Sequence, residues 1–400
     1  MTDELPPLPT RRTHIFDPPP GLGALRQQSP VCPVRMPDGV PGWLVTGHAE
    51  SQAVLADPRF SARQDLRRPP EGEPSPPPAA PGFFVRMDGP EHARYRREVA
   101  RHLTQRRLRA LVPLITAVTD QHLDAVADAG PPTDLVTAFG LPVPSLVVAG
   151  LLGVRGHDLE RFQGHSRTMV DLLAAPAEVA AATAAVRELL ARVVAELADD
   201  PDEGLLSALL AAGLTQQEVV GTGFLLLVAG HETTANMATL AVFALLCHPR
   251  ELAAARAALV DAGDDRPDPR ATAAVDELLR YLTVNQFGAL RVPTTDLELA
   301  GRRLCRGEPV VVSLAAANRD PGVFAEPDRL HLARNGNPHL AFGHGAHLCS
   351  GHQLARLELQ IMLGHLLRRF PTLRLEVAPQ QVPLRHASSV YGVARLPVAW

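Results

Sequence analysis

One stretch of ten residues differs most from the helical patterns around it: Phe342-Gly343-His344-Gly345-Ala346-His347-Leu348-Cys349-Ser350-Gly351. Its glycines allow backbone angles and close approaches that other residues cannot adopt. A helix is predicted over residues 351–370, so Cys349 falls at or near a helix N-terminus, where the dipole and free N–H groups stabilise a thiolate. The stretch therefore predicts a cysteine presented by a tight turn to a soft partner.

The partner of this cysteine stays open on these residues alone. A lone thiolate suits haem iron, zinc or another thiophilic metal. His344, His347 and His352 could complete a zinc site with Cys349. Against zinc, tight glycine spacing holds one sulfur at a surface better than it gathers four ligands into a tetrahedron. A buried free cysteine in a glycine turn is the ordinary alternative.

Residues 215–247 have the pattern of one long helix. Thr215 and Glu218 match a capping box, in which each side chain satisfies a free backbone N–H group of the other residue. The helix should end before Pro249 and measure roughly 50 Å. Because residues 219–230 contain no charge, we expect this helix to cross the interior of the molecule.

The uncharged run of this helix ends in Ala229-Gly230-His231-Glu232-Thr233-Thr234. Burying a carboxylate such as that of Glu232 is unfavourable unless the group pairs with another group or takes part in chemistry. Gly230 leaves space beside the backbone. Threonine hydroxyls can bond to the carbonyl four residues earlier and bend the helix. The pattern suits binding of a small ligand and proton delivery to it, whereas a polar helix end turned toward water is the structural alternative.

The rest of the chain predicts a single large, mainly helical domain with small β-sheets over residues 1–400, of which residues 1–30 look largely irregular. Residues 67–82 are proline-rich and predict a long surface loop. The other helices are expected over 90–102, 105–128, 133–151, 157–173, 177–198, 203–212, 249–263 and 271–283. Strands are expected over 286–292, 297–304, 308–313, 372–376 and 385–397.

Composition excludes several classes of protein. With 46% hydrophobic and 20% charged residues, the chain can bury a large core and is neither disordered nor fibrous. It contains no lysine, which excludes Schiff-base enzymes and lysine-containing phosphate-binding loops. A net charge of −4 argues against nucleic-acid or membrane partners. Four scattered cysteines and no visible secretory signal predict a cytoplasmic protein.

Together these residues resemble the haem-thiolate monooxygenases, the cytochromes P-450, and more closely their soluble bacterial branch of antibiotic and natural-product biosynthesis. Residues 342–351 match the cysteine signature of the family, and residues 229–234 match the oxygen-activation motif of its long central helix. Glu277-Leu278-Leu279-Arg280 matches its Glu-x-x-Arg motif, although alone such a pair is more often a solvated salt bridge. The match runs in order from about residue 40 to the C-terminus.

The resemblance implies a cytochrome P-450-type domain that binds haem b (iron protoporphyrin IX) beneath the long helix. Cys349 is then the axial ligand of the haem iron, and Glu232 and Thr233 deliver protons to O2. Ala229 and Gly230 form the groove for O2. The other implied haem contacts are Phe342 and Gly351 beside the ligand, and His92, Arg96, Arg291 and His347 at the propionates. Glu277 and Arg280 are implied to be structural.

The resemblance also implies a substrate class and partners. The expected reaction is hydroxylation or epoxidation of a bulky hydrophobic natural product, such as a macrolide, another polyketide or a terpenoid. The expected pocket residues are Phe83, Phe84, Val85, Leu226, Asn285, Phe287 and Tyr391. Electrons are expected from a ferredoxin and its NAD(P)H-dependent reductase, docked on the Arg-rich residues 94–109 and Arg356. A non-catalytic haem carrier or sensor is the alternative, but it has no use for Glu232 and Thr233.

Overall fold

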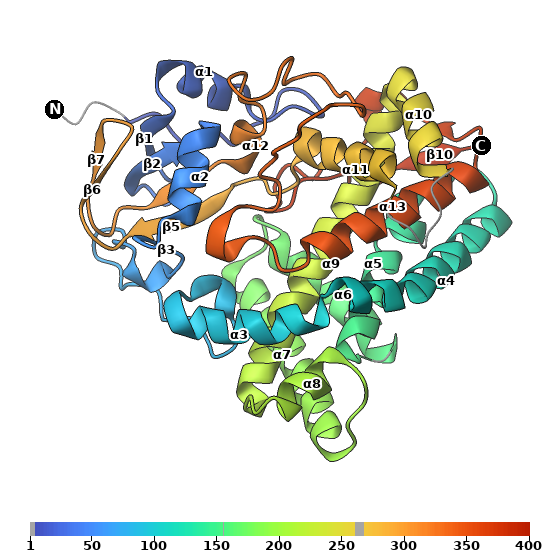
Figure 1. Ribbon diagram of the computed structural model, residues 1–400, viewed down its shortest axis with the longest axis horizontal. Coiled ribbons are helices and arrows are strands. Elements are labelled where there is room, and N and C mark those ends of the chain that lie inside the picture. Colours follow the sequence, from blue (N-terminus) through green and yellow to red (C-terminus); the bar gives the residue numbers. More distant parts are fainter. Residues whose placement is uncertain (1–4, 155, 261–267) are drawn as a thin grey trace.

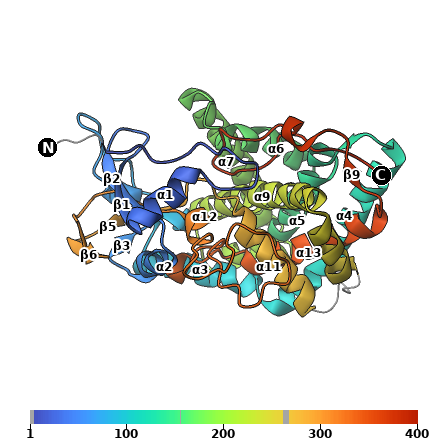
Figure 2. The ribbon, with the colours of Figure 1, turned by 90° about the horizontal axis from the view of Figure 1, so that it is seen from above.

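Helix α9, Gln216–Cys247, runs through the middle of the molecule, and the other elements are arranged around it (Figures 1 and 2). The computed structural model describes residues 5–154, 156–260 and 268–400. The predicted capping box is confirmed: the Glu218 amide donates to Thr215 Oγ1 at 3.3 Å, and the Thr215 amide donates to Glu218 Oε2 at 2.8 Å. The long helix therefore begins and ends where the sequence predicts.

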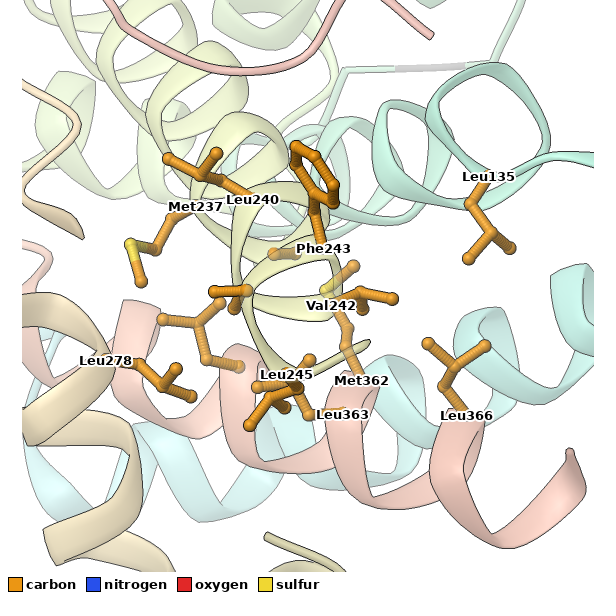
Figure 3. Close-up of a cluster of buried hydrophobic side chains, with 14 of the residues drawn as sticks. Leu135, Met237, Leu240, Val242, Phe243, Leu245, Leu278, Met362, Leu363 and Leu366 are labelled. Carbon is orange, nitrogen blue, oxygen red and sulfur yellow. The ribbon is translucent and has the colours of Figure 1, made fainter. Parts of the chain in front are cut away.

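The largest hydrophobic core surrounds the C-terminal half of α9 (Figure 3). Nearly every side chain of α9 from residue 234 to residue 245 is buried, which is the pattern of a helix enclosed on all sides. Met237, Leu240 and Phe243 pack there with Leu278 of α11, Pro269–Leu282, and Leu363 of α13, His352–Arg369. Full burial of each such side chain contributes about 1.5–3 kcal/mol, so this core fixes the position of α9.

The remaining helices surround α9. They are α1 Pro20–Gln28, α2 His48–Ala56, α3 Gly89–His102, α4 Gln105–Ala129, α5 Pro142–Leu152, α6 Gly156–Val170, α7 Pro176–Asp199, α8 Leu205–Ala211, α10 Pro249–Ala255 and α12 Leu314–Ala317. Three of them, α1, α2 and α12, have no counterpart among the helices that the sequence predicts.

The strands form small sheets at two sides of the helical body: the large sheet and the β6–β7 hairpin lie at the left of Figure 1, and β10 lies at the right, beside the C-terminus. The largest sheet has the order β1-β2-β8-β5-β3, with bounds β1 Val31–Arg35, β2 Pro41–Val45, β8 Val310–Val312, β5 Ala289–Pro293 and β3 Phe60–Ser61. The smaller sheets are β4-β10-β9, with bounds Thr133–Asp134, Pro397–Ala399 and Arg374–Leu375, and the hairpin of β6 Leu297–Leu299 with β7 Arg302–Leu304. In the large sheet β2 is parallel to β8, so residues from opposite ends of the chain share one sheet.

The predicted architecture, mainly helical with small sheets, is confirmed, while several element boundaries were wrong. Residues 1–30 contain α1. The helix expected over 133–151 is instead β4, a π-helical turn at Val136–Gly140 and α5, because Pro142 begins a new helix at its first position. Most of the strand expected over 385–397 forms only isolated bridges before β10. The helix expected over 249–263 ends in a π-helical turn at Arg256–Val260, and its last residues lie outside the described part of the chain.

Among residues 5–154, 156–260 and 268–400, no helix combines the length and the apolar character that a membrane span requires.

Candidate active site

Cys349 lies in a tight turn that ends three residues before α13 begins. A 3-10 turn at Gly345–His347 precedes it, and the Cys349 amide donates to the Phe342 carbonyl at 2.9 Å. Gly345 has φ +70°, and a Cβ there would lie 2.4 Å from the Leu55 carbonyl oxygen at the end of α2. Only glycine allows this approach, so the turn is held against α2 in the form that the sequence predicts.

The Cys349 side chain is accessible although protein surrounds it. The residue is exposed, yet burial raises the pKa of its thiol, and the Gly351 amide, Arg96 and Arg356 oppose that shift. Accessibility combined with a protein environment is the arrangement expected of a side chain that binds an enclosed ligand. The zinc alternative finds no support in the described ranges, since no three His, Cys, Asp or Glu side chains there are placed to hold a metal ion.

Four cationic or ionisable side chains expected at the propionates come together beside the cysteine turn. His92 and Arg96 lie on α3, Arg291 lies on β5, and His347 lies in the turn itself. The rings of His92 and His347 are 4.2 Å apart between centroids, and Arg96 Nη1 lies 3.4 Å from Ser350 Oγ. Burial, together with the charges of His347, Arg96 and Arg291, lowers the pKa of His92 to about 4.

This cationic cluster has donors that the described protein groups leave without acceptors. The Nε2 atom of His92 is buried and has no hydrogen-bond partner. Arg291 is 8% exposed, and its side chain bonds only to the adjacent Leu290 carbonyl within the described residues. Asp88 is the acid of the cluster and already accepts from His347, Ser61 and the Ala62 amide. The surplus of donors fits the two propionates of a haem, since arginine pairs well with carboxylates.

Thr233 and Gly230 lie near the middle of α9. The Thr233 hydroxyl donates to the carbonyl of Ala229 at 2.6 Å, the bond to the fourth preceding residue that the sequence suggests. Ala229 itself is exposed. A Cβ at Gly230 would lie 3.1 Å from Val148 Cγ2 on α5. Gly230 thus allows α5 to approach α9, a packing role that sequence reasoning missed.

Glu232 is 1% exposed and is paired with an arginine that sequence reasoning also missed. Its Oε2 atom accepts from Arg385 Nη1 at 2.7 Å and from Asn236 Nδ2 at 3.1 Å. Its Oε1 atom is buried, has no hydrogen-bond partner among the described residues and lies 3.9 Å from His231 Nδ1. Burial lowers the pKa of His231 to about 4, and Ser166 Oγ lies 3.2 Å from the same ring nitrogen. No local pattern marks Arg385, because it lies 153 residues from Glu232 in the chain.

Glu277 and Arg280 form a fully buried pair in α11 rather than a solvated one. Arg280 donates to both carboxylate oxygens of Glu277, and it also donates to the carbonyls of Asn318, Pro327 and Arg329. These carbonyls belong to the segment that leads to the cysteine turn. The pair therefore anchors the segment that precedes the cysteine turn in the chain.

The residues expected to line the substrate pocket divide into accessible and buried groups. Val85 is 44% exposed, while Phe83, Leu226 and Phe287 are half-buried. Two others are buried core residues: Phe84 is 4% exposed, and Tyr391 is fully buried with its hydroxyl donating to the Ile15 carbonyl at 2.7 Å.

Tyr391 therefore belongs to the core and is left out of the pocket. The side-chain oxygen of Asn285 accepts from the Gly288 amide at 2.8 Å, which gives this residue a role in its own turn. Gln286 is buried and donates to the carbonyls of His386 and Ser388, so it joins two segments of the backbone.

Comparisons with known proteins agree with this arrangement. The family model described as cytochrome P450 matches residues 178–397. The chain is 44% identical over 394 residues to cytochrome P450 105C1 of Streptomyces sp, covering 98% of this chain and 97% of the relative. It is 43% identical over 387 residues to nocardicin C N-oxygenase of Nocardia uniformis subsp. tsuyamanensis, covering 95% of each. The crystal structure of CYP105P1 in complex with filipin I matches with a TM-score of 0.92 and 38% identity, over 99% of both chains.

The comparisons cover nearly the whole chain at identities well above the level at which only the fold is shared. The structure itself places an accessible thiol in a glycine turn near a buried donor of His92 that has no partner among the described residues, and it places an acid and an alcohol on α9. This chain belongs to the cytochrome P450 family and is a haem-thiolate monooxygenase.

Proposed function

We propose that this enzyme inserts one oxygen atom of O2 into a bulky hydrophobic natural product, by hydroxylation or epoxidation, with electrons from a ferredoxin. The observation on which the proposal mainly rests is the accessible Cys349 thiol in its glycine turn, beside the donors of His92, Arg96, Arg291 and His347. Bound haem iron supplies O2 activation, and its thiolate ligand favours cleavage of the O–O bond. We assign Cys349 as that ligand and the four cationic side chains to the propionates.

The chain's own residues move the protons that this reaction consumes. Glu232 is the buried acid, and Thr233 is the alcohol one residue further along α9. The Thr233 hydroxyl is held by the Ala229 carbonyl at 2.6 Å, which fixes its oxygen as an acceptor for the next proton. A positioned acid–alcohol pair of this kind typically contributes about 10²–10⁴-fold to a rate. The role of Glu232 and Thr233 is therefore proton delivery.

The substrate is proposed to be a macrolide, another polyketide or a terpenoid. Val85, Phe83, Leu226 and Phe287 offer accessible apolar surface for it, and they lie on three separate segments of the chain. One relative is named for nocardicin C, and a similar structure contains filipin I. These names support a bulky natural product as the substrate class.

The electron donor is proposed to be an acidic ferredoxin with its NAD(P)H-dependent reductase. Exposed arginines follow the end of α3 and the start of α4, at positions 97, 101, 106, 107 and 109. A surface of one charge attracts a partner of opposite charge. Glu98 pairs with Arg97 and Arg101, but both guanidinium groups stay 64% exposed. Arg356 is not part of this surface, because its side chain is only 19% exposed and its Nε atom donates to Asp276 at 2.6 Å.

The haem assignment is tested by the spectrum of the reduced protein with carbon monoxide. The wild-type protein should show the strongly red-shifted Soret band of a thiolate-ligated haem, and Cys349→Ala should lose it. Cys305→Ala is the matched control, since Cys305 follows the β6–β7 hairpin and should keep the band. A red-shifted band that survives in Cys349→Ala would refute the assignment of the ligand.

The docking surface is tested by the salt dependence of ferredoxin-supported turnover. Exposed charges are screened over a Debye length of about 8 Å at physiological ionic strength, so turnover at low ferredoxin concentration should fall as salt rises. Arg106→Gln should raise the ferredoxin concentration needed for half-maximal rate, and Arg303→Gln on the β7 hairpin should not. Turnover that is independent of salt would contradict electrostatic docking.

A further inference from the structure

Arg385 reaches the buried acid of the site from a segment with no other link to proton transfer. Its Nη1 atom donates to Glu232 Oε2 at 2.7 Å and lies 3.4 Å from Asn236 Oδ1. The Arg385 side chain is 16% exposed, and that of Glu232 is 1% exposed. No other guanidinium in the described parts of the chain is in contact with the Glu232 carboxylate.

The backbone around Arg385 is built to make this contact. The Arg385 amide donates to the Gly392 carbonyl at 2.9 Å, and Leu384 pairs with Val393 in the same turn. A Cβ at Gly392 would lie 2.0 Å from Asn236 Oδ1, so only glycine lets this turn lie directly on α9. The turn and α9 are thereby locked together at the level of Glu232.

The segment that bears Arg385 is also bonded to the C-terminal end of α6. Its backbone is bonded to the end of α6: the Leu172 amide donates to Ala387, and the Ser389 amide donates to Val170, each at 3.1 Å. On the other edge of the segment, the backbone amide of Tyr391 donates to the Val284 carbonyl at 2.8 Å. The segment therefore has backbone hydrogen bonds on both edges, and these bonds fix the position of the backbone that carries Arg385.

The physical consequence concerns the two oxygens of Glu232. A carboxylate removed from water needs an ion pair and hydrogen bonds to compensate the loss of hydration. Arg385 and Asn236 supply both to Oε2, while Oε1 is left without a hydrogen-bond partner. The pairing therefore determines which oxygen remains available for proton exchange.

We propose that Arg385 is a positioning residue, which holds the Glu232 carboxylate by Oε2 and so presents Oε1 for proton delivery. This inference rests on the proton-delivery role proposed for Glu232. It predicts a defect in turnover rather than in substrate binding when the guanidinium is removed.

The experiment compares Arg385→Met, Arg385→Lys, Glu232→Gln and the double variant Arg385→Met/Glu232→Gln in the haem-loaded enzyme. The probe is 7-ethoxycoumarin, whose O-dealkylation is followed by fluorescence with a plant-type ferredoxin, its reductase and NADPH. Arg385→Met should lower kcat roughly tenfold or more, within the range of a lost acid–base group, and change KM and the spin-state dissociation constant less than about twofold. Arg385→Lys should restore most of kcat. Arg303→Met, which breaks an exposed pair with Asp296, is the matched control and should behave like the wild type.

A second readout does not depend on turnover. Arg385→Met strands a buried carboxylate, so it should lower the melting temperature, and adding Glu232→Gln should restore part of the loss because the stranded charge is removed. The inference is overturned if Arg385→Met turns over like Arg303→Met, or if the double variant melts below Arg385→Met. It is also overturned if the Met and Lys variants lose kcat and substrate binding equally. Full activity in Glu232→Gln would instead refute the proton role of Glu232 itself, and with it this inference.

Discussion

Replacing Arg280 by methionine should weaken the structure behind the cysteine turn far more than any surface substitution. Both members of the Glu277–Arg280 pair are 0% exposed, and breaking a buried pair typically reduces the free energy of unfolding by about 3–5 kcal/mol. Arg334 still pairs with Glu277 at 3.0 Å, so the lower end of that range applies to the pair. The carbonyls of Asn318 and Pro327 lose their donor as well, at about 1 kcal/mol each. The Arg329 carbonyl keeps a hydrogen bond from Arg334 at 3.2 Å.

The expected total for Arg280→Met is therefore about 5 kcal/mol. An unfolding entropy of about 2.1 cal/mol/K per residue gives roughly 0.8 kcal/mol/K for a chain of 400 residues. The melting temperature should then fall by about 6 °C. Circular dichroism at a fixed scan rate measures this shift, and the absorbance ratio of haem to protein measures the loss of haem that should accompany it.

Two further variants keep the test decisive if Arg280→Met does not fold. Arg334→Met removes one bond to Glu277 and the bonds to the carbonyls of Ala325, Glu326 and Arg329, so it should lower the melting temperature by about 4 °C. Arg329→Met breaks an exposed pair with Glu326 and should change it by less than about 1 °C. A melting temperature of Arg280→Met within 1 °C of the Arg329→Met value would refute the reasoning about the buried pair.

Two other substitutions test local features of α9. Burial alone would raise the pKa of Glu218, but hydrogen bonds from Arg94, the Thr215 amide and Tyr95 outweigh it and lower the pKa from 4.5 to about 2. The stability that this carboxylate contributes is therefore complete above the unfolded-state pKa and is lost as the pH falls toward 2. In denaturant titrations at pH 7, Glu218→Gln should thus have a lower free energy of unfolding than the wild type. This difference in free energy should shrink below about pH 4.5. A difference that grows below that pH would contradict this account. Gly392→Ala would place a Cβ 2.0 Å from Asn236 Oδ1, so it should lower the free energy of unfolding by about 1–3 kcal/mol. Gly23→Ala in α1 is the control: no atom lies within 4 Å of the added Cβ, so it should be neutral or slightly stabilising. Equal melting temperatures for the two glycine variants would count against the close packing of the turn on α9.

The sequence predicts those parts of the site whose signals are local. Cys349 is recognisable because the glycines of its turn and the start of α13 are its immediate neighbours in the chain. The capping box at Thr215 and Glu218 joins residues three positions apart, and α9 begins there as predicted. Glu232 and Thr233 are recognisable because an acid at the end of an uncharged helical run departs from the pattern around it.

Pairing between distant segments is where sequence reasoning fails. The parallel pairing of β2 with β8 places Trp43 opposite Val310, and no local pattern marks a partner so far away in the chain. Tyr391 is an aromatic residue of a kind that often lines pockets, but its side chain is buried and its hydroxyl donates to the Ile15 carbonyl. It therefore packs in the core. In the same way, the proline-rich segment gives no sign that Gly82 packs against the backbone of α9 at Glu218.

The contrast is clearest at Glu232. Helical periodicity and a run without charge place its carboxylate inside the molecule, because both are properties of residues within a few turns of it. Which charge compensates that burial is decided only when the chain folds back and brings Arg385 to within 2.7 Å across 153 residues. Helix propensity and capping act over three or four residues, whereas an ion pair acts through space between whichever groups the packing of the core brings together. The local sequence therefore predicts where Glu232 lies, whereas only the tertiary structure determines that Arg385 is its partner.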